Sequence, residues 1–252
     1  MGGLMPRRRT EFGPEDVEHY GRREFLDDVF DYEGGEHVTV LAPSGGGKTH
    51  LSYELLEVTA RPELQAIVFV MKPRDETAEK FTKRAKFRTV RQWPPPLRHR
   101  VQSKPPGWTL WPQTTFDPDV DDSRQYAIFK AAIRDSYRRG DRILFADETY
   151  SLENELPNGG LTKELRTVHT KGRSMKCGIW SASQRAAYIN RWAYQAHHLF
   201  LGFDPDDDAQ RRLSEIGAAV DKALVREVVG SLRQYEWLYI HRDSRTMCII
   251  EP

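Results

Sequence analysis

The chain has few cysteines, no long apolar segment and no excess of charge of either sign. Its two cysteines, Cys177 and Cys248, match neither a metal-binding spacing nor a disulfide framework, which favours a reducing environment. No apolar stretch approaches the roughly 20 residues of a membrane span, and the N-terminus lacks the apolar core of a signal peptide. We therefore expect a soluble, cytoplasmic protein without a membrane segment.

Charge is abundant but balanced. Charged residues make up 30% of the sequence, and 38 basic residues nearly cancel 37 acidic ones, giving a formal net charge of +1. Overall charge therefore neither favours nor excludes a nucleic-acid partner, which only a local cluster of basic residues can indicate. A length of 252 residues suits one α/β domain with a small appendage.

The most informative segment is a glycine-rich loop directly after the apolar run at 37–41. It reads Ala-Pro-Ser-Gly-Gly-Gly-Lys-Thr over 42–49. In such a P-loop the backbone N–H groups and the following helix N-terminus bind a polyphosphate, the lysine reaches the β- and γ-phosphates, and the hydroxyl ligates Mg²⁺. A purely structural glycine turn is the alternative. The nucleotide-binding residues expected here are Pro43, Ser44, Gly45, Gly46, Gly47, Lys48, Thr49 and His50.

Two acids, Asp147 and Glu148, follow the apolar run at 142–146. A carboxylate at this strand end can hold Mg²⁺ opposite Thr49, so we expect Thr49 and Asp147 to be the metal ligands. Glu148 is then placed to take a proton from an attacking water, which favours a hydrolase over a kinase of small molecules. Acidic pairs at strand ends also serve as helix caps, so this prediction depends on the P-loop upstream.

Gln184 directly follows another apolar run, at 178–183, and Arg173 precedes it. A side-chain amide at a strand end both donates to and accepts from a γ-phosphate or a water, so Gln184 is a candidate catalytic residue. Arg173 is a candidate arginine finger that would reach the nucleotide of a neighbouring subunit, with Arg166 as a second candidate. The alternative for Arg173 is a surface arginine near a helix C-terminus.

Short apolar strands alternate with helical patterns along the chain, which predicts a mainly parallel sheet covered on both faces. We expect a basic arm and a helix over 1–33, the helix beginning at Pro14, and a nucleotide-binding domain over 34–252. Further helices are expected at 48–58, 124–139, 161–170, 206–216 and 219–229. Strands are expected at 37–41, 66–71, 142–147, 178–183 and 198–203, followed by a β-hairpin over 236–250.

One segment, at about 80–116, departs from this alternation because it lacks Asp and Glu but is rich in lysine, arginine, proline and tryptophan. Such an insertion suits contact with phosphates and stacking on bases. The alternative, equally open, is a solvated loop whose tryptophans pack back onto the core. The DNA-binding residues expected here are Arg84, Arg88, Arg91, Arg98 and Arg100.

The P-loop, the acidic pair and the segment Gly178-Ile-Trp-Ser-Ala-Ser-Gln-Arg185 together resemble the FtsK–HerA superfamily of P-loop translocases, over about 37–217. The resemblance implies a RecA/ASCE-like three-layer sandwich with sheet order 5-1-4-3-2, the glutamine strand lying between the P-loop and Walker-B strands. It implies ATP and Mg²⁺ as cofactors, Lys48 and Thr49 as ligands, and Asp147 as metal partner. Glu148 would be the catalytic base and Gln184 the γ-phosphate sensor.

Within that superfamily the chain looks most like the small viral genome-packaging ATPases. This implies a motor acting on double-stranded DNA as a homo-oligomeric ring, pentameric or hexameric, with a capsid or portal partner in the host cytoplasm. The basic segment or the Leu156–Gly160 loop would move along the DNA. Two other functions stay open: a morphogenesis or secretion ATPase acting on protein, and a nucleotide-gated DNA-binding subunit. No Asn-Lys-x-Asp motif occurs, which argues against a GTPase.

Overall fold

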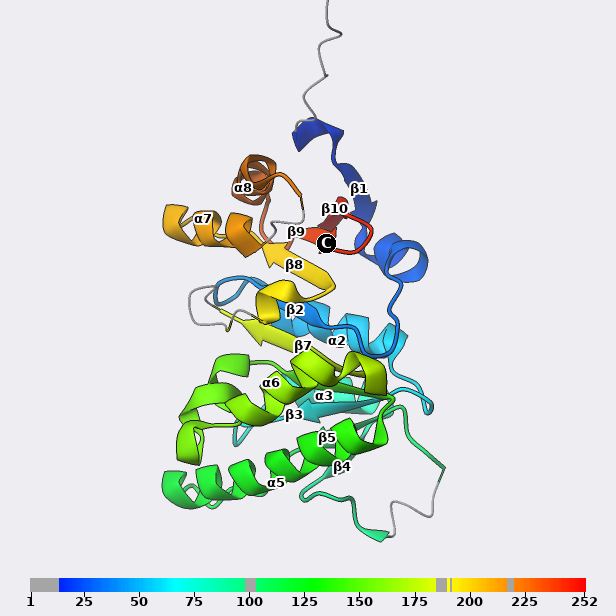
Figure 1. The fold of residues 1–252 in the computed structure, drawn as a ribbon, viewed down its shortest axis with the longest axis vertical. Coiled ribbons are helices and arrows are strands. Elements are labelled where there is room, and N and C mark those ends of the chain that lie inside the picture. Colours follow the sequence, from blue (N-terminus) through cyan, green and yellow to red (C-terminus); the bar gives the residue numbers. More distant parts are fainter. Residues whose placement is uncertain (1–13, 98–102, 185–189, 191, 217–219) are drawn as a thin grey trace, which may run out of the picture.

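A computed structural model describes residues 14–97, 103–184, 190, 192–216 and 220–252 (Figure 1). Within these residues ten strands form one sheet, in the order β1-β10-β9-β8-β2-β7-β6-β3-β5-β4. In chain order the strands are β1 (Glu18–Gly21), β2 (Val38–Leu41), β3 (Gln65–Phe69), β4 (Arg88–Val90), β5 (Gly107–Leu110), β6 (Arg142–Ala146), β7 (Cys177–Ser183), β8 (His198–Gly202), β9 (Trp237–His241) and β10 (Thr246–Glu251).

The sheet is parallel from β8 through β4, and the predicted C-terminal β-hairpin is present as β9 and β10. β9 runs antiparallel to both β8 and β10. β7 lies between β2 and β6. Because the carboxyl ends of parallel strands meet at one edge of a sheet, the residues that follow β2, β6 and β7 are brought together there.

Helices cover both faces of the sheet, so the predicted three-layer fold class is confirmed (Figure 1). None of the helices that the structure describes has the length and apolar character that a membrane span requires. The helices are α1 (Arg22–Glu24), continued by a π-helical turn (Phe25–Val29), α2 (Lys48–Thr59), α3 (Glu76–Arg84), α5 (Pro118–Arg139), α6 (Thr162–Lys171), α7 (Asp207–Ile216) and α8 (Lys222–Ser231).

Alternation along each strand divides the core between the two faces. In β3, Val68 packs in one apolar cluster with Leu55 of α2, whereas its neighbour Ile67 packs in another with Ile133 of α5. The first cluster also takes in the N-terminal helical turn through Phe25. Such strands, buried on both faces, explain the unbroken apolar runs of the sequence.

The ends of the long helix α5 show why these boundaries form. The Asp117 side chain accepts hydrogen bonds from the N–H groups of Asp119 and Val120, and Pro118 occupies the first turn. Gly140 follows the last helical residue, as the sequence predicted. The helix therefore begins before the expected residue 124, because an aspartate cap followed by proline starts a helix without further support.

The helix predicted from Pro14 is wrong in its first part. Residues Pro14–Asp16 form a 3₁₀ turn and β1 follows, paired in parallel with the outer edge of β10. Helical structure begins only at Arg22. Pairing with β10 satisfies backbone N–H and C=O groups along that strand, an interaction that local helical periodicity does not reveal.

The described parts of the basic segment at 80–116 contain a helix end and two strands where an inserted loop was expected. Its first residues belong to α3, and β4 and β5 extend the parallel sheet beyond β3. Trp108 and Trp111 are buried, and the half-buried Trp93 donates its indole N–H to Asp135 at 3.1 Å. Trp108 and Trp111 therefore pack onto the core, as the second alternative expected of the tryptophans, and their rings are not exposed for stacking on nucleic-acid bases.

Candidate nucleotide-binding site

The P-loop connects β2 to α2 and depends on its glycines. Gly45 and Gly47 have φ of 78° and 85°, in the left-handed region that glycine adopts without strain. A side chain at Gly46 would collide with the Ala42 side chain, whose Cβ lies 2.8 Å from the position of an added Cβ. Because residue 46 is glycine, the small side chain of Ala42 fits at the start of the motif and the loop can fold tightly.

Lys48 opens α2 and is buried beneath the loop. Its Nζ donates to the carbonyl oxygens of Ala42 at 2.7 Å and Pro43 at 2.9 Å. Burial lowers the pKa of Lys48, and the charges of Asp147 and Glu148 act in the opposite direction. The ammonium is thus held at the loop next to two carboxylates, where phosphate oxygens would replace the carbonyls as its partners.

The two acids follow β6 and face α2. The Thr49 hydroxyl donates to Asp147 Oδ1 at 2.8 Å, which joins the two residues expected to ligate the metal. Ser183, the last residue of β7, donates its hydroxyl to Glu148 Oε1 at 3.4 Å. Burial, and then the charge of Asp147, raise the pKa of Glu148 above its ordinary value of 4.5. A carboxylate with a raised pKa is a better proton acceptor when ionised.

A cavity of about 820 Å³ unites these groups, and Gln184, just after β7, lines it too. Of the expected loop residues, Pro43 and Gly46 do not line this cavity; the Gly46 N–H instead donates to the Pro43 carbonyl at 3.1 Å. The expected residues that line it are Ser44, Gly45, Gly47, Lys48, Thr49, His50, Asp147, Glu148 and Gln184. Residues far apart in sequence thus meet at the carboxyl edge of the sheet.

Lys72 and Tyr235 are among the lining residues that were not expected from the sequence. Lys72 follows β3, and its Nζ lies 3.6 Å from Asp147 Oδ2. Tyr235 precedes β9, and its ring carbon Cδ1 would lie 3.2 Å from a Cβ placed at Gly47. The Arg22 guanidinium holds this turn by donating to the Tyr235 carbonyl at 3.0 Å while pairing with Glu54 of α2. Lys72 could have been predicted as a site residue because it is a cation that follows an apolar run. No feature of the sequence marks Tyr235.

Arg173 lies at the opposite edge of the sheet from this cavity. It precedes β7 whereas Gln184 follows it, so the seven residues of the strand separate them by about 20 Å. Its guanidinium lies 3.7 Å from a carboxylate oxygen of Asp243 in the β9–β10 turn. Within one chain Arg173 therefore does not reach the cavity, and Arg166 is exposed on α6. Neither residue lines the cavity.

The expected DNA contacts are held in different ways. Arg84 pairs with Glu57 at 2.6 Å, and Arg91 donates to the Trp111 carbonyl at 2.9 Å with its guanidinium over the Trp111 ring. Arg88 donates to the Ser103 hydroxyl at 3.5 Å. Arg98 and Arg100 lie outside the described residues.

Comparison with known proteins bears on the fold. No family model matches the sequence, and neither does any curated protein. Among solved structures, the DNA-packaging ATPase B204 from Sulfolobus Turreted Icosahedral Virus aligns with a TM-score of 0.60 at 15% identity, covering 88% of this chain and 99% of that one. VirB4 of Thermoanaerobacter pseudethanolicus gives 0.61 at 11% identity, with 86% and 89% covered.

The genome packaging NTPase B204 from Sulfolobus turreted icosahedral virus 2, in complex with AMPPCP, is similar at a TM-score of 0.58 and 18% identity, over 86% of this chain and 97% of that one. At such identities the likeness establishes the fold. The chain therefore shares the fold of these ATPases, which agrees with the fold that its motifs predicted.

Proposed function

We propose that the protein is an ATP-hydrolysing motor that moves double-stranded DNA, acting as a genome-packaging subunit. The observation that carries the proposal is the convergence of Lys48, Thr49, Asp147, Glu148 and Gln184 on one cavity. The shared fold of a DNA-packaging ATPase over 88% of the chain supports it.

The residues beside the P-loop fit Mg²⁺. The Thr49 hydroxyl and the Asp147 carboxylate, already joined by a hydrogen bond of 2.8 Å, are the hard oxygen donors that this cation prefers. When bound with ATP, Mg²⁺ neutralises charge on the β- and γ-phosphates. Thr49 and Asp147 would hold it, and Lys48 would exchange its two carbonyl partners for phosphate oxygens.

In the proposed reaction Glu148 takes a proton from the water that attacks the γ-phosphate. Its carboxylate is half-buried beside Asp147, and the Ser183 hydroxyl orients it. Gln184, next along the chain, would hydrogen-bond the γ-phosphate and report its loss to the segment that follows. We further propose a homo-oligomeric ring in which the exposed Arg173 reaches a neighbouring subunit's nucleotide, because it cannot reach its own.

An ATPase that acts on protein is the second candidate. It is favoured by the basic segment itself, since Trp108 and Trp111 are buried and Arg84 and Arg91 have intramolecular partners. A nucleotide-gated DNA-binding subunit accounts less well for the site, because binding alone requires no carboxylate such as Glu148 beside the phosphate-binding loop.

Steady-state ATP hydrolysis, measured with and without double-stranded DNA at two ionic strengths, tests the proposal. We expect turnover that DNA stimulates at low salt and less so at high salt, because phosphate contacts are screened. Glu148→Gln should keep ATP binding and lower turnover by at least about a hundredfold. Because Glu148 must be ionised to accept a proton, wild-type turnover should fall as the pH drops through its raised pKa.

The matched control is Glu215→Gln, which removes an exposed carboxylate on α7 and should leave turnover unchanged. Equal turnover in wild type and Glu148→Gln would remove Glu148 from its role. Hydrolysis that responds to no DNA at either ionic strength would instead favour the protein-directed ATPase.

A further inference from the structure

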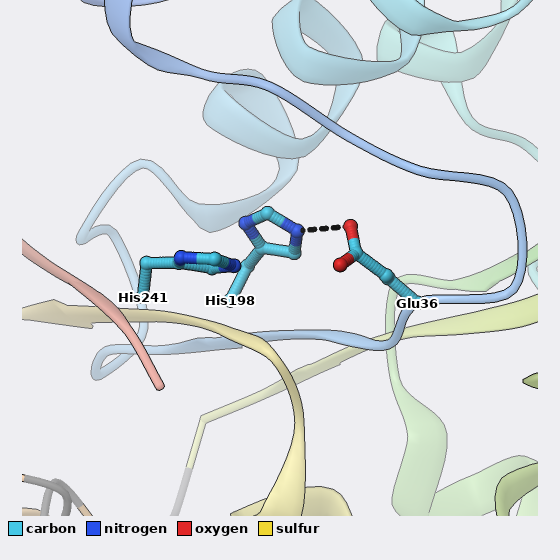
Figure 2. A group of neighbouring side chains, drawn as sticks. All are labelled: Glu36, His198 and His241. Atoms are coloured by element: carbon cyan, nitrogen blue, oxygen red, sulfur yellow. Dashed lines mark hydrogen bonds and ion pairs between the residues drawn. The ribbon is translucent and has the colours of Figure 1, made fainter. Parts of the chain in front are cut away.

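A second cluster of metal-binding side chains lies at the edge of the sheet opposite the nucleotide cavity. Glu36 comes two residues before β2, His198 begins β8 and His241 ends β9. Because β9 is antiparallel to β8, His198 and His241 are directly paired, and His198 also pairs with Val38 of β2. Three neighbouring strands thus bring one candidate ligand each to the same place (Figure 2).

The distances within this cluster are close to those of a metal site. His198 Nε2 lies 2.9 Å from Glu36 Oε2, and one ligand atom of each residue lies within 4.8 Å of the other two. Figure 2 shows the ring of His241 pointing toward His198 from the side opposite Glu36. Tetrahedral zinc with bonds of about 2.0–2.1 Å needs ligand atoms roughly 3.3 Å apart. A small rotation of the partly exposed His241 side chain would supply the difference.

Hydrogen bonds already orient both imidazoles for this task. Nδ1 of His198 lies 2.9 Å from the Tyr239 hydroxyl, and Nδ1 of His241 lies 2.7 Å from the Ser244 hydroxyl. A ligating histidine typically donates its second ring N–H to an oxygen in this way, which leaves the lone pair of the other nitrogen free. With a metal bound, the Nδ1–H of each ring would donate to its hydroxyl, and Nε2 of His198, which faces Glu36 Oε2 in this structure, would exchange that hydrogen bond for the metal.

The carboxylate is oriented as well. The Glu33 N–H donates to Glu36 Oε2 at 2.8 Å, and among the described residues Oε1 has no hydrogen-bond partner.

We propose that Glu36, His198 and His241 form a zinc site that ties β2, β8 and β9 together, with water as the fourth ligand. Two nitrogen donors and one oxygen donor suit Zn²⁺, whereas Mg²⁺ and Ca²⁺ prefer oxygen ligands alone. The site lies away from the nucleotide cavity and does not depend on the function proposed for it. Its role is to fix the C-terminal hairpin against the strand that carries the P-loop.

Two neighbouring histidines, His37 and His197, already use ring nitrogens in hydrogen bonds. His37 accepts at Nδ1 from the Ile179 N–H and its Nε2 faces the His169 carbonyl, so both of its nitrogens are engaged. Nδ1 of His197 accepts from the His37 N–H. Among the described residues, the metal-ligand atoms that converge within 4.8 Å of one another are those of Glu36, His198 and His241.

Titration of the metal-free full-length chain with ZnCl₂ in excess Mg²⁺, followed by calorimetry, tests the site. The excess Mg²⁺ competes at the oxygen ligands Thr49 and Asp147. We expect one Zn²⁺ per chain, a higher Tm with Zn²⁺, and visible Co²⁺ absorption bands of a nitrogen- and oxygen-ligated centre on substitution. His241→Gln should weaken the affinity for Zn²⁺ by at least about tenfold.

Ser244→Ala keeps all three ligands but removes the hydroxyl that orients His241, so it should weaken Zn²⁺ binding by about 10–100-fold. This variant tests the site independently if His241→Gln does not fold. The matched control is His19→Gln, since exposed His19 also lies beside a carboxylate, Glu251, at 3.0 Å. Its affinity should equal that of the wild type. Absence of Zn²⁺ binding by the wild type, or unchanged affinity in both His241→Gln and Ser244→Ala, would show that the cluster is only a hydrogen-bonded triad.

Discussion

The charged side chains of the nucleotide cavity partly compensate one another before any ligand binds. The positive charges of Lys48 and Lys72 lie near the negative charges of Asp147 and Glu148. The Lys72 Nζ is 3.6 Å from Asp147 Oδ2. In the proposed function, an incoming Mg²⁺-nucleotide would add a cation for the acids and anionic oxygens for the lysines. The local charge balance is thereby kept, which lowers the cost of bringing phosphates into a half-buried site.

Tyr235 offers a single-residue test of base recognition. Its half-exposed ring lies beside Gly47, where it can stack on a purine. We expect Tyr235→Ala to weaken ATP binding by about 1–3 kcal/mol, roughly five- to 150-fold, through loss of aromatic stacking. Equilibrium titration with ATP or a non-hydrolysable analogue measures the change.

Tyr235→Phe is the matched control because it keeps the ring. At this position φ is 71°, so phenylalanine and alanine meet the same backbone strain. The phenylalanine variant should bind ATP as the wild type does. Equal affinity of the alanine variant and the wild type would mean that the base lies elsewhere.

Site residues could be predicted from the sequence where an acidic or amide side chain directly follows a predicted strand. Asp147, Glu148 and Gln184 each follow an apolar run, and parallel topology then places them together. Tyr235 could not be predicted, because it reaches the P-loop through the turn before the hairpin and no local motif marks it. The Glu36–His198–His241 cluster was hidden for the same reason: its members are dispersed in sequence and only strand register unites them.

At the scale of elements, the basic segment combines packing with surface charge. Trp108 of β5 packs in the apolar cluster that contains Phe129 and Ile133 of α5, while Arg84 is exposed and Arg88 is partly exposed. Arg91 is drawn onto the face of Trp111, with its guanidinium 5.6 Å from the ring centroid. Any nucleic-acid contact here would therefore be made to phosphates rather than by stacking.

Replacing the expected DNA contacts tests this element. Binding to double-stranded DNA should lose salt dependence, because each lost phosphate contact lowers the slope of log K against log salt by about 0.9, up to about 4.5 in total. Fluorescence anisotropy over a salt series gives the slope. The variant carries glutamine in place of Arg84, Arg88, Arg91, Arg98 and Arg100.

A second variant with five exposed arginines replaced elsewhere controls for the change in net charge. An equal loss of slope in both variants would show that only overall charge matters, and no loss in the first would exclude the segment as the DNA contact. The control positions are Arg23, Arg211, Arg212, Arg233 and Arg245.

Elements were predictable where the apolar pattern was unambiguous. The buried strands at β2, β6 and β7 are short apolar runs next to turn or charged residues, and Gly140 ends α5 as expected. The pattern over 14–21 suits either a helix or a strand, and the partner that decides, β10, lies at the other end of the chain. The tryptophans of the basic segment were ambiguous because composition does not tell a stacking surface from a core contact.

At the scale of the whole molecule, buried histidines at one edge of the sheet link stability to pH. Burial lowers the pKa of His37 to about 4 from an ordinary 6.5, and it also lowers the pKa of His169, His197 and His198. His37 Nδ1 now accepts a hydrogen bond from the Ile179 N–H. Protonation of Nδ1 would break this bond and place two N–H groups against each other. The unfolded chain therefore takes up protons first as the pH falls.

We expect the free energy of unfolding to have its full value above pH 6.5 and to decrease as the pH falls toward about 4. Protonation of His37 alone should lower it by about 3 kcal/mol. Urea denaturation at a series of pH values, with a chelator present, measures it. His37→Gln cannot be protonated in this range, so its stability should depend less on pH. His19→Gln serves as the control and should follow the wild type; identical pH dependence in His37→Gln would contradict the assignment.

The outermost strand of the sheet on one side is β1, which lies along β10 from Glu18 beside Cys248 to Gly21 beside Glu251. Without it, β10 would present unpaired backbone groups to solvent, a template for strand pairing between copies of the chain. Removal of the residues up to Gly21 would therefore expose the edge of β10 and favour aggregation. Any shortened version of the chain has to retain β1, which begins at Glu18, although this strand lies outside the nucleotide-binding motifs.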